Sequence, residues 1–123
     1  GQINAWDNAD FVEAVKKTGR KKLIVAGVST EVCVAFVALS AVKEGFEVYA
    51  VIDASGTWNK LVQEVAVARM VQAGVQPITW VAVGAELLGN WNHPQGQAHA
   101  KVMGEHLPFY SNLFASFMSA KNS

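Results

Sequence analysis

The stretch KLIVAGVSTEVCVAF, residues 22–36, changes from a strand pattern to a helix pattern within a few residues. Residues 22–28 form an almost continuous apolar run without alternation, which is typical of a strand buried on both faces. Such strands belong to parallel sheets, in which the chain returns through a helix before the next strand begins. The helical pattern that follows, residues 31–44, stops at Gly45 and therefore predicts the first of these connecting helices.

The same strand and helix pattern recurs further along the chain. EVYAVIDAS, residues 47–55, predicts a second strand, and residues 61–73 predict a helix closed by Gly74. PITWVAV, residues 77–83, predicts a third strand that opens with a proline, which is tolerated at the first position of a strand. Repeated strand and helix units predict the α/β class: a Rossmann-like open parallel sheet with helices on both faces, in three layers. This chain then supplies only three strands.

The two ends of the chain differ from this repeating centre. A short amphipathic helix is predicted from Asn8, which can cap its first amides, to Gly19, a favourable residue for a left-handed helix end. After Leu88 the strand signals stop, and the tail contains two helical patterns, the second rich in aromatic residues. The first strand is apolar enough to be central in a sheet. We therefore expect these residues to be the second half of a larger sheet, whose other strands precede Gly1 or come from another chain.

Composition excludes several classes of function. The 123 residues carry ten basic and ten acidic side chains, which makes nucleic acid and membrane surfaces poor candidate partners. No apolar stretch approaches the length of a membrane span, and a single cysteine cannot form an internal disulfide, which favours a reducing compartment, the cytoplasm. The three histidines are irregularly spaced in the tail, so no metal site is predicted.

Cys33, the only cysteine, allows two interpretations. If Thr30 is the N-cap of the helix, Cys33 lies in its first turn, where unpaired amides and the helix dipole favour a thiolate. A cysteine in that position can have a pKa of roughly 3.5 to 7.5 and act as a nucleophile. Alternatively, Cys33 is one more small apolar side chain buried beside Val32 and Val34. The residues alone leave both interpretations open.

The sequence of residues 23–56 resembles the nucleophile region of the isochorismatase-like cysteine hydrolases. That family has an apolar strand, the pattern Gly-(Val/Ile)-x-Thr-x-x-Cys-Val, a helix rich in alanine, Gly-(aromatic)-x-Val, and a strand that ends in Asp-Ala. The matching positions are Gly27, Val28, Thr30, Cys33, Val34, Gly45, Phe46, Val48, Asp53 and Ala54. GQINAWDNADF at the start and ARMVQAGVQPITWVAVGAEL later in the chain are similar to the YcaC-like branch of this superfamily.

The resemblance implies a site around Cys33. Cys33 would be the nucleophile, and the backbone amides of Ser29 and Cys33 would form the oxyanion hole. The peptide bond between Val28 and Ser29 matches a non-proline cis bond of the family, an arrangement that costs about 3–4 kcal/mol. Trp6 and Thr30 would belong to the substrate pocket, although a tryptophan simply packed against the sheet is an equal alternative. Asp53 would organise the turn after its strand.

Two members of the family's catalytic triad, an aspartate and a lysine, have no match in this sequence. The resemblance places both before the part similar to GQINAW, so a chain that begins at Gly1 would be inactive. We therefore expect residues 1–123 to be the C-terminal portion of a single isochorismatase-like hydrolase domain, with residues 89–123 as a helical tail.

The predicted function is that of a cysteine hydrolase that attacks a small amide, ester or related carbonyl substrate. The resemblance implies homo-oligomers, octamers among them, and no cofactor. The alternative is a non-catalytic assembly or anion-binding protein in which the cysteine is structural.

Overall fold

A computed structural model describes residues 1–123, which form two compact units, Gly1–Trp80 and Val81–Ser123. The elements of the first unit are η1 (Ala5–Asp7), α1 (Ala9–Lys17), β1 (Lys22–Val25), η2 (Thr30–Val34), α2 (Ala35–Lys43), β2 (Glu47–Val51), η3 (Ile52–Ala54), α3 (Lys60–Ala73) and β3 (Gln76–Ile78). Helix α4 (Trp80–Leu88) begins at the last residue of this unit, and α5 (Gly96–His106) and α6 (Pro108–Lys121) follow in the second.

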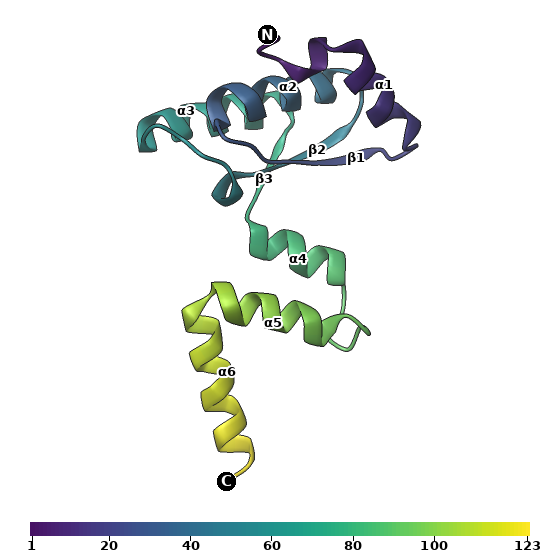
Figure 1. Cartoon of the computed structure of the whole chain (residues 1–123). Helices are drawn as coiled ribbons and strands as arrows, with labels where there is room; N and C mark the ends of the chain where they lie inside the picture. Colours follow the sequence, from purple (N-terminus) through teal and green to yellow (C-terminus); the bar gives the residue numbers. More distant parts are fainter. The chain divides into compact units, whose positions relative to one another are not determined.

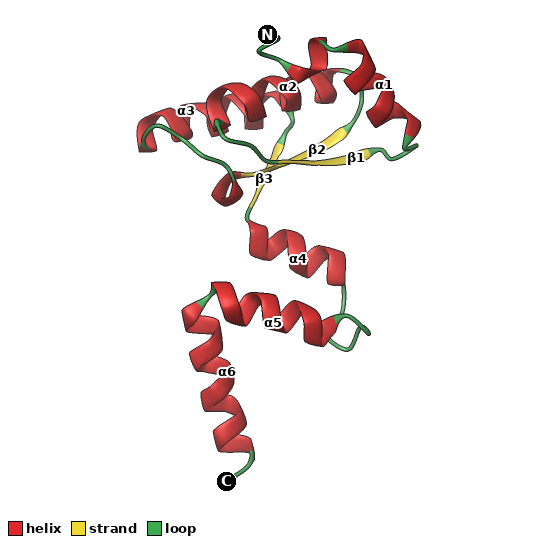
Figure 2. Ribbon diagram, in the orientation of Figure 1, coloured by secondary structure: helices red, strands yellow, loops and turns green.

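Three parallel strands in the order β1-β2-β3 form the sheet, which confirms the predicted α/β class (Figure 1). In the register of the sheet, Val25 pairs with Ala50 and Ala50 pairs with Pro77. Because crossovers between parallel strands are right-handed, two successive crossovers in one direction place both helices on the same face. Figure 2 shows α2 and α3, together with α1, on one side of the strands. The second helical layer of the predicted three-layer arrangement is not part of this unit.

The core of the first unit lies between the sheet and helix α2. Val48 and Ala50 of β2 are fully buried against α2, whose Ala38 and Ala41 are equally inaccessible. The outer strand β1 is only half-buried, and Ile24 is 51% exposed. The prediction that this strand is buried on both faces is therefore wrong for the described chain, because β1 pairs on one side only and helices cover one face of the sheet.

The third strand is shorter than predicted. Strand β3 ends at Ile78, and the apolar residues 80–83 begin helix α4 instead of continuing the strand. A short apolar run fits a strand and a buried helix equally well, so its periodicity could not distinguish them. The carboxylate of Asp53 accepts a hydrogen bond from the Trp80 amide at 2.8 Å, which satisfies one of the free donors at the start of the helix. Asp53 thus stabilises the start of α4 after β3, and not the turn directly after its own strand as expected.

The helix ends follow the local sequence signals. The Asn8 side chain accepts hydrogen bonds from the amides of Asp10 and Phe11, which confirms it as the N-cap of α1. Gly74 ends α3 in the left-handed conformation, with φ of 98°, which a side chain would disfavour. The next amide, that of Val75, turns back to the carbonyl of Met70 at 2.9 Å. These ends are local in origin, and so the sequence predicts them well.

The second unit is helical, as predicted for the tail. Gly84 of α4 packs against α5 so closely that an added Cβ would lie 2.6 Å from Nε2 of His99. The turn between α5 and α6 is fixed by the Ser111 hydroxyl, which donates to the carbonyl of Gly104 at 2.9 Å. No helix of the structure has the length and apolar character needed to cross a membrane.

Candidate active site at the carboxyl edge of the sheet

Two loops meet where β1 and β2 end, at the carboxyl edge of the sheet. The amide and the hydroxyl of Thr30 both donate to the carbonyl of Gly56, at 2.8 and 2.7 Å. The amide of Gly56 in turn donates to the carbonyl of Gly27 at 3.0 Å, and the amide of Gly27 donates to Oγ of Ser55 at 3.3 Å. An added Cβ on Gly56 would collide with the carbonyl of Val28. The loop after β1 is thus held tightly against the loop after β2.

Thr30 therefore has a different position from the one predicted. Thr30 is fully buried, and the N-cap of the helical segment is Ser29 instead. The prediction of Thr30 as N-cap is wrong by one residue. The hydroxyl of Thr30 is bound to the Gly56 carbonyl, so in this structure the side chain holds the two loops together rather than facing a pocket.

The helical segment opens with a π-turn, η2, before it continues as α2. The amide of Val34 donates to the carbonyl of Ser29, five residues earlier, at 3.1 Å. Single π-turns are rare and are frequently found at functional sites. The amide of Ser29, just before this turn, has no hydrogen-bond acceptor in this structure.

The side chain of Cys33 is exposed and reduced. Its neighbours Val34 and Ala35 turn inward and are each only 1% exposed. Of the two interpretations of this cysteine, burial among apolar neighbours is therefore wrong. The structure brings one accessible thiol and the free amide of Ser29 into the same turn.

The peptide bond between Val28 and Ser29 is not cis, because the structure contains no cis peptide bond. The expected cis bond at this position is therefore a wrong prediction for this structure. A non-proline cis bond persists only where surrounding contacts impose it. Val28 is 89% exposed and offers few such contacts.

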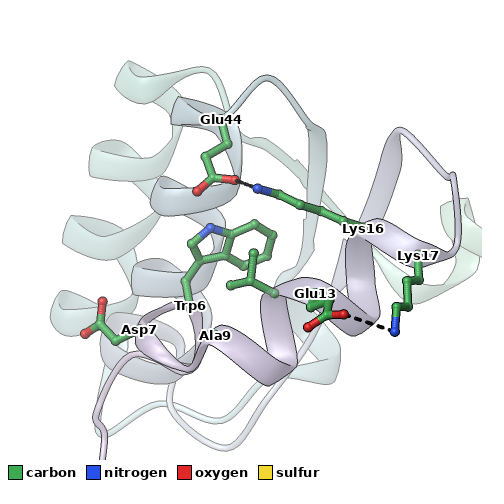
Figure 3. Close-up of a pocket in the computed structure, with 8 residues that line it drawn as sticks. Trp6, Asp7, Ala9, Glu13, Lys16, Lys17 and Glu44 are labelled. Carbon is green, nitrogen blue, oxygen red and sulfur yellow. Dashed lines mark ion pairs between the residues drawn. The ribbon is translucent and has the colours of Figure 1, made fainter.

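Trp6 is not brought together with Cys33. It lies near the other end of α2, where its ring packs edge-to-face against Phe46 and Phe11, with centroids 5.6 and 6.1 Å apart. Glu44 lies eleven positions after Cys33 along a mostly helical chain, a distance of roughly 16 Å at 1.5 Å per residue. Trp6 lines an open groove of about 620 Å³. Figure 3 shows its lining residues, most of which come from α1 and the end of α2. The packed alternative for this tryptophan agrees with its 9% exposure.

Two ion pairs border this groove. The Lys16 ammonium lies 2.9 Å from the Glu44 carboxylate, and Lys17 lies 3.0 Å from Glu13 (Figure 3). The pKa of Glu44 is lowered, mainly by the hydrogen bond from Lys16 and secondarily by the indole N–H of Trp6. Nε1 of Trp6 is buried and forms no hydrogen bond of good geometry, so its effect on Glu44 is the weaker one.

The lowered pKa of Glu44 predicts how the first unit responds to acid. A carboxylate whose folded-state pKa lies below its ordinary value of 4.5 adds stability above that value, and this stability is lost as the pH falls through the folded-state pKa. Denaturant midpoints of the wild type and of Glu44→Gln, measured from pH 6 to pH 3, should differ most at pH 6 and converge toward pH 3. A difference that grows on acidification would contradict the assignment.

Glu31, which the sequence analysis did not single out, is an unusual residue beside the site. Both of its carboxylate oxygens and Oγ of Ser29 are buried without a hydrogen-bond partner. No lysine, arginine or histidine forms an ion pair with Glu31. A buried carboxylate without a partner is costly, because water no longer solvates its charge. Only the three-dimensional arrangement reveals that the Glu31 carboxylate has no partner, since a glutamate in the first turn of a helix is common in sequences.

Replacing Glu31 with glutamine is expected to raise the free energy of unfolding by about 1 kcal/mol, because a neutral amide costs less to bury than a carboxylate without a hydrogen-bond partner. Urea denaturation at pH 7 measures this change. Glu13→Gln is the control: its carboxylate is exposed and paired with Lys17, so a change within about 0.5 kcal/mol is expected. Clear destabilisation by Glu31→Gln would show instead that the carboxylate has a cationic partner in the assembled protein.

No group of three or more histidine, cysteine, aspartate or glutamate side chains is placed to hold a metal ion. The candidate catalytic groups that the turn presents are the thiol of Cys33 and the amide of Ser29.

The first strand of the parallel sheet leads through a tight turn into a helix, and this helix carries a single exposed cysteine. The comparison with known families agrees with this arrangement. The sequence profile described as Isochorismatase domain matches residues 2–82, and the chain belongs to this family. Among its relatives, the probable hydrolase YcaC of Escherichia coli K12 is 53% identical over 117 residues, which cover 95% of this chain and 56% of the relative.

Two solved structures of YcaC proteins superpose well. The structure of YcaC from Pseudomonas aeruginosa with hexane-2,5-diol and covalent acrylamide gives a TM-score of 0.87 at 56% identity, covering 95% of this chain and 57% of that one. The 1.8 Å structure of the Escherichia coli ycaC product is described as an octameric hydrolase of unknown specificity. It gives a TM-score of 0.89 at 53% identity, covering 98% of this chain and 58% of that one. The chain thus spans a little over half the length of these relatives.

Proposed function

We propose that this protein is a cysteine hydrolase that acts by thiolate attack on a small amide, ester or related carbonyl compound. The observation that carries the proposal is the exposed thiol of Cys33 in the same turn as the unbonded amide of Ser29. Membership of the isochorismatase family, and likeness to a protein described as a probable hydrolase, support it.

The proposed reaction proceeds in two steps. The Cys33 thiolate forms a bond to the carbonyl carbon, and the carbonyl oxygen takes the electron pair as a tetrahedral oxyanion. The amides of Ser29 and Cys33 donate to this oxyanion, and the amine or alcohol leaves with a proton to give a thioester. Water then attacks the thioester carbon, the acid is released, and the thiol is regenerated.

The proton transfers need a base and a cation that these residues do not provide at Cys33. Lys16, Lys17 and Lys22 are engaged elsewhere: Lys16 with Glu44, Lys17 with Glu13, and Lys22 with Glu47 at 3.9 Å. We propose that residues outside this sequence supply the aspartate and the lysine, and that residues 1–123 form the C-terminal portion of one domain, with 89–123 as its tail. General acid and base assistance is typically worth 10²- to 10⁴-fold in rate.

The proposal includes assembly into homo-oligomers and a cytoplasmic location. A relative that is 53% identical and superposes on 98% of this chain is described as octameric, which supports an oligomer of the same kind. A single cysteine that cannot form an internal disulfide supports a reducing compartment.

Covalent labelling of Cys33 tests the proposed nucleophile. Acrylamide is an electrophilic amide that alkylates thiolates, and it is bound covalently in the Pseudomonas aeruginosa relative. Incubation of the purified full-length protein with acrylamide should give one adduct per chain, mapped to Cys33 by peptide mass spectrometry. Loss of esterase or amidase activity should follow the extent of labelling. Complete labelling with unchanged activity would refute the proposed role, and a panel of small amides and esters would define the substrate class.

A further inference from the structure

Helix α6 displays an apolar stripe to solvent. Phe109, Leu113 and Phe117 repeat at intervals of four residues and are 84%, 72% and 61% exposed. Phe114 lies beside them, is 52% exposed, and stacks on Tyr110 with ring centroids 6.3 Å apart. None of the residues of α6 is fully buried. A helix of fourteen residues with this stripe uncovered is unfavourable in water, because helices gain most of their stability from packing an apolar face.

The exposed area is large for so few side chains. The three phenylalanines together expose the equivalent of about two whole rings, or roughly 300–500 Å². That already equals the largest apolar patch on a typical monomer, and such a patch is often functional. A stable interface buries about 800 Å² on each partner, so the stripe has the size of an interface centre surrounded by a polar rim.

The charge distribution favours an identical partner. Lys121, the last residue of α6, is its only charged residue, so two copies of the stripe would meet without repulsion. The hydroxyl of Ser111 holds α6 to the carbonyl of Gly104 in α5, so the stripe is presented on a fixed helix. Residues spaced by four form the ridges that interdigitate when two helices pack. The same stripe on two chains is therefore self-complementary about a twofold axis.

From these observations we infer that the stripe Phe109, Leu113, Phe114 and Phe117 packs against the same stripe of a second copy of this chain. The inference rests on the proposed homo-oligomer and specifies one of its interfaces. The superposition with the octameric Escherichia coli structure covers 98% of the chain, which leaves room for only a few unmatched residues, so at least most of α6 has a counterpart there.

Light scattering after size-exclusion chromatography tests the stripe in the full-length protein. The variant Phe109→Gln/Leu113→Gln/Phe117→Gln should have at most half the wild-type mass. The matched control, Asn112→Gln/Ala115→Gln/Ser119→Gln, changes the opposite, polar side of the same helix and should keep the wild-type mass. Circular dichroism monitors helix content in both. A stripe variant with the wild-type mass would overturn the inference while leaving the oligomer intact, whereas a monomeric wild type would overturn both.

Cross-linking keeps the inference testable if the triple variant fails to fold. In a Cys33→Ala background, Leu113→Cys places one thiol at the centre of the stripe, near the inferred twofold axis. Mild oxidation should join most chains into disulfide-linked dimers, while Ser119→Cys on the opposite side should give few. Equal cross-linking at the two positions would overturn the inference. Acrylamide labelling of Cys33 in the triple variant reports separately on the proposed hydrolase.

Discussion

Replacing Cys33 with alanine is expected to lower kcat/KM of the full-length protein by at least about 10³-fold, with the fold intact. The thiol forms the covalent bond to substrate in the proposed mechanism, and no other cysteine in this sequence can replace it. Because the side chain is exposed, the free energy of unfolding should change by no more than about 0.5 kcal/mol.

Steady-state kinetics and urea denaturation of the same preparation measure the two quantities. Cys33→Ser is the matched variant, since it keeps the size and polarity of the side chain but is a far weaker nucleophile without a dedicated base. Activity of Cys33→Ala within tenfold of the wild type would exclude this thiol as nucleophile and favour the structural alternative for the cysteine.

Replacing Gly56 with alanine is expected to damage both stability and activity. The added Cβ would collide with the backbone carbonyl of Val28, and a backbone atom can move away only if the loop moves with it. The Gly56 carbonyl accepts both hydrogen bonds from Thr30, so the turn that presents Cys33 would shift. We expect a destabilisation of about 1–3 kcal/mol from overpacking. A displacement of about 1 Å at the thiol would lower kcat/KM by roughly 10²-fold.

Gly104→Ala is the matched control for this substitution. Gly104 lies in α5, where an added Cβ meets only Oγ of Ser111, at 3.3 Å, and a side chain can shift by the few tenths of an ångström that this contact requires. Alanine also favours a helix over glycine, so stability should be unchanged or slightly higher. Wild-type activity in Gly56→Ala would show that the contact with Val28 does not position the catalytic turn.

The features predicted correctly are those that a few neighbouring residues determine. Asn8 caps α1 because its own side chain reaches the amides two and three residues ahead. Gly74 ends α3 because a left-handed residue is required there. Parallel pairing followed from the apolar runs of β1 and β2, since their length and spacing leave room for a crossover helix.

The features missed depend on contacts between distant parts of the chain. Residues 80–83 are helical partly because Asp53, far back in the sequence, accepts from the Trp80 amide. Trp6 packs on Phe46, and no sequence spacing reveals that this contact lies away from Cys33. The unpaired carboxylate of Glu31 is likewise a property of burial, which the identity of the residue does not disclose.

The one-sided pairing of β1 has a consequence for native-state hydrogen exchange. In a parallel ladder, alternate amides of a strand point to opposite neighbours, and β1 has a neighbour on the β2 side only. In residues 1–123 alone, deuterium should therefore enter Lys22–Val25 at two rates that alternate along the strand, slowly at amides bonded to β2 and quickly at the others. Uniformly slow exchange in the full-length protein would show that a further strand lies along the free edge of β1.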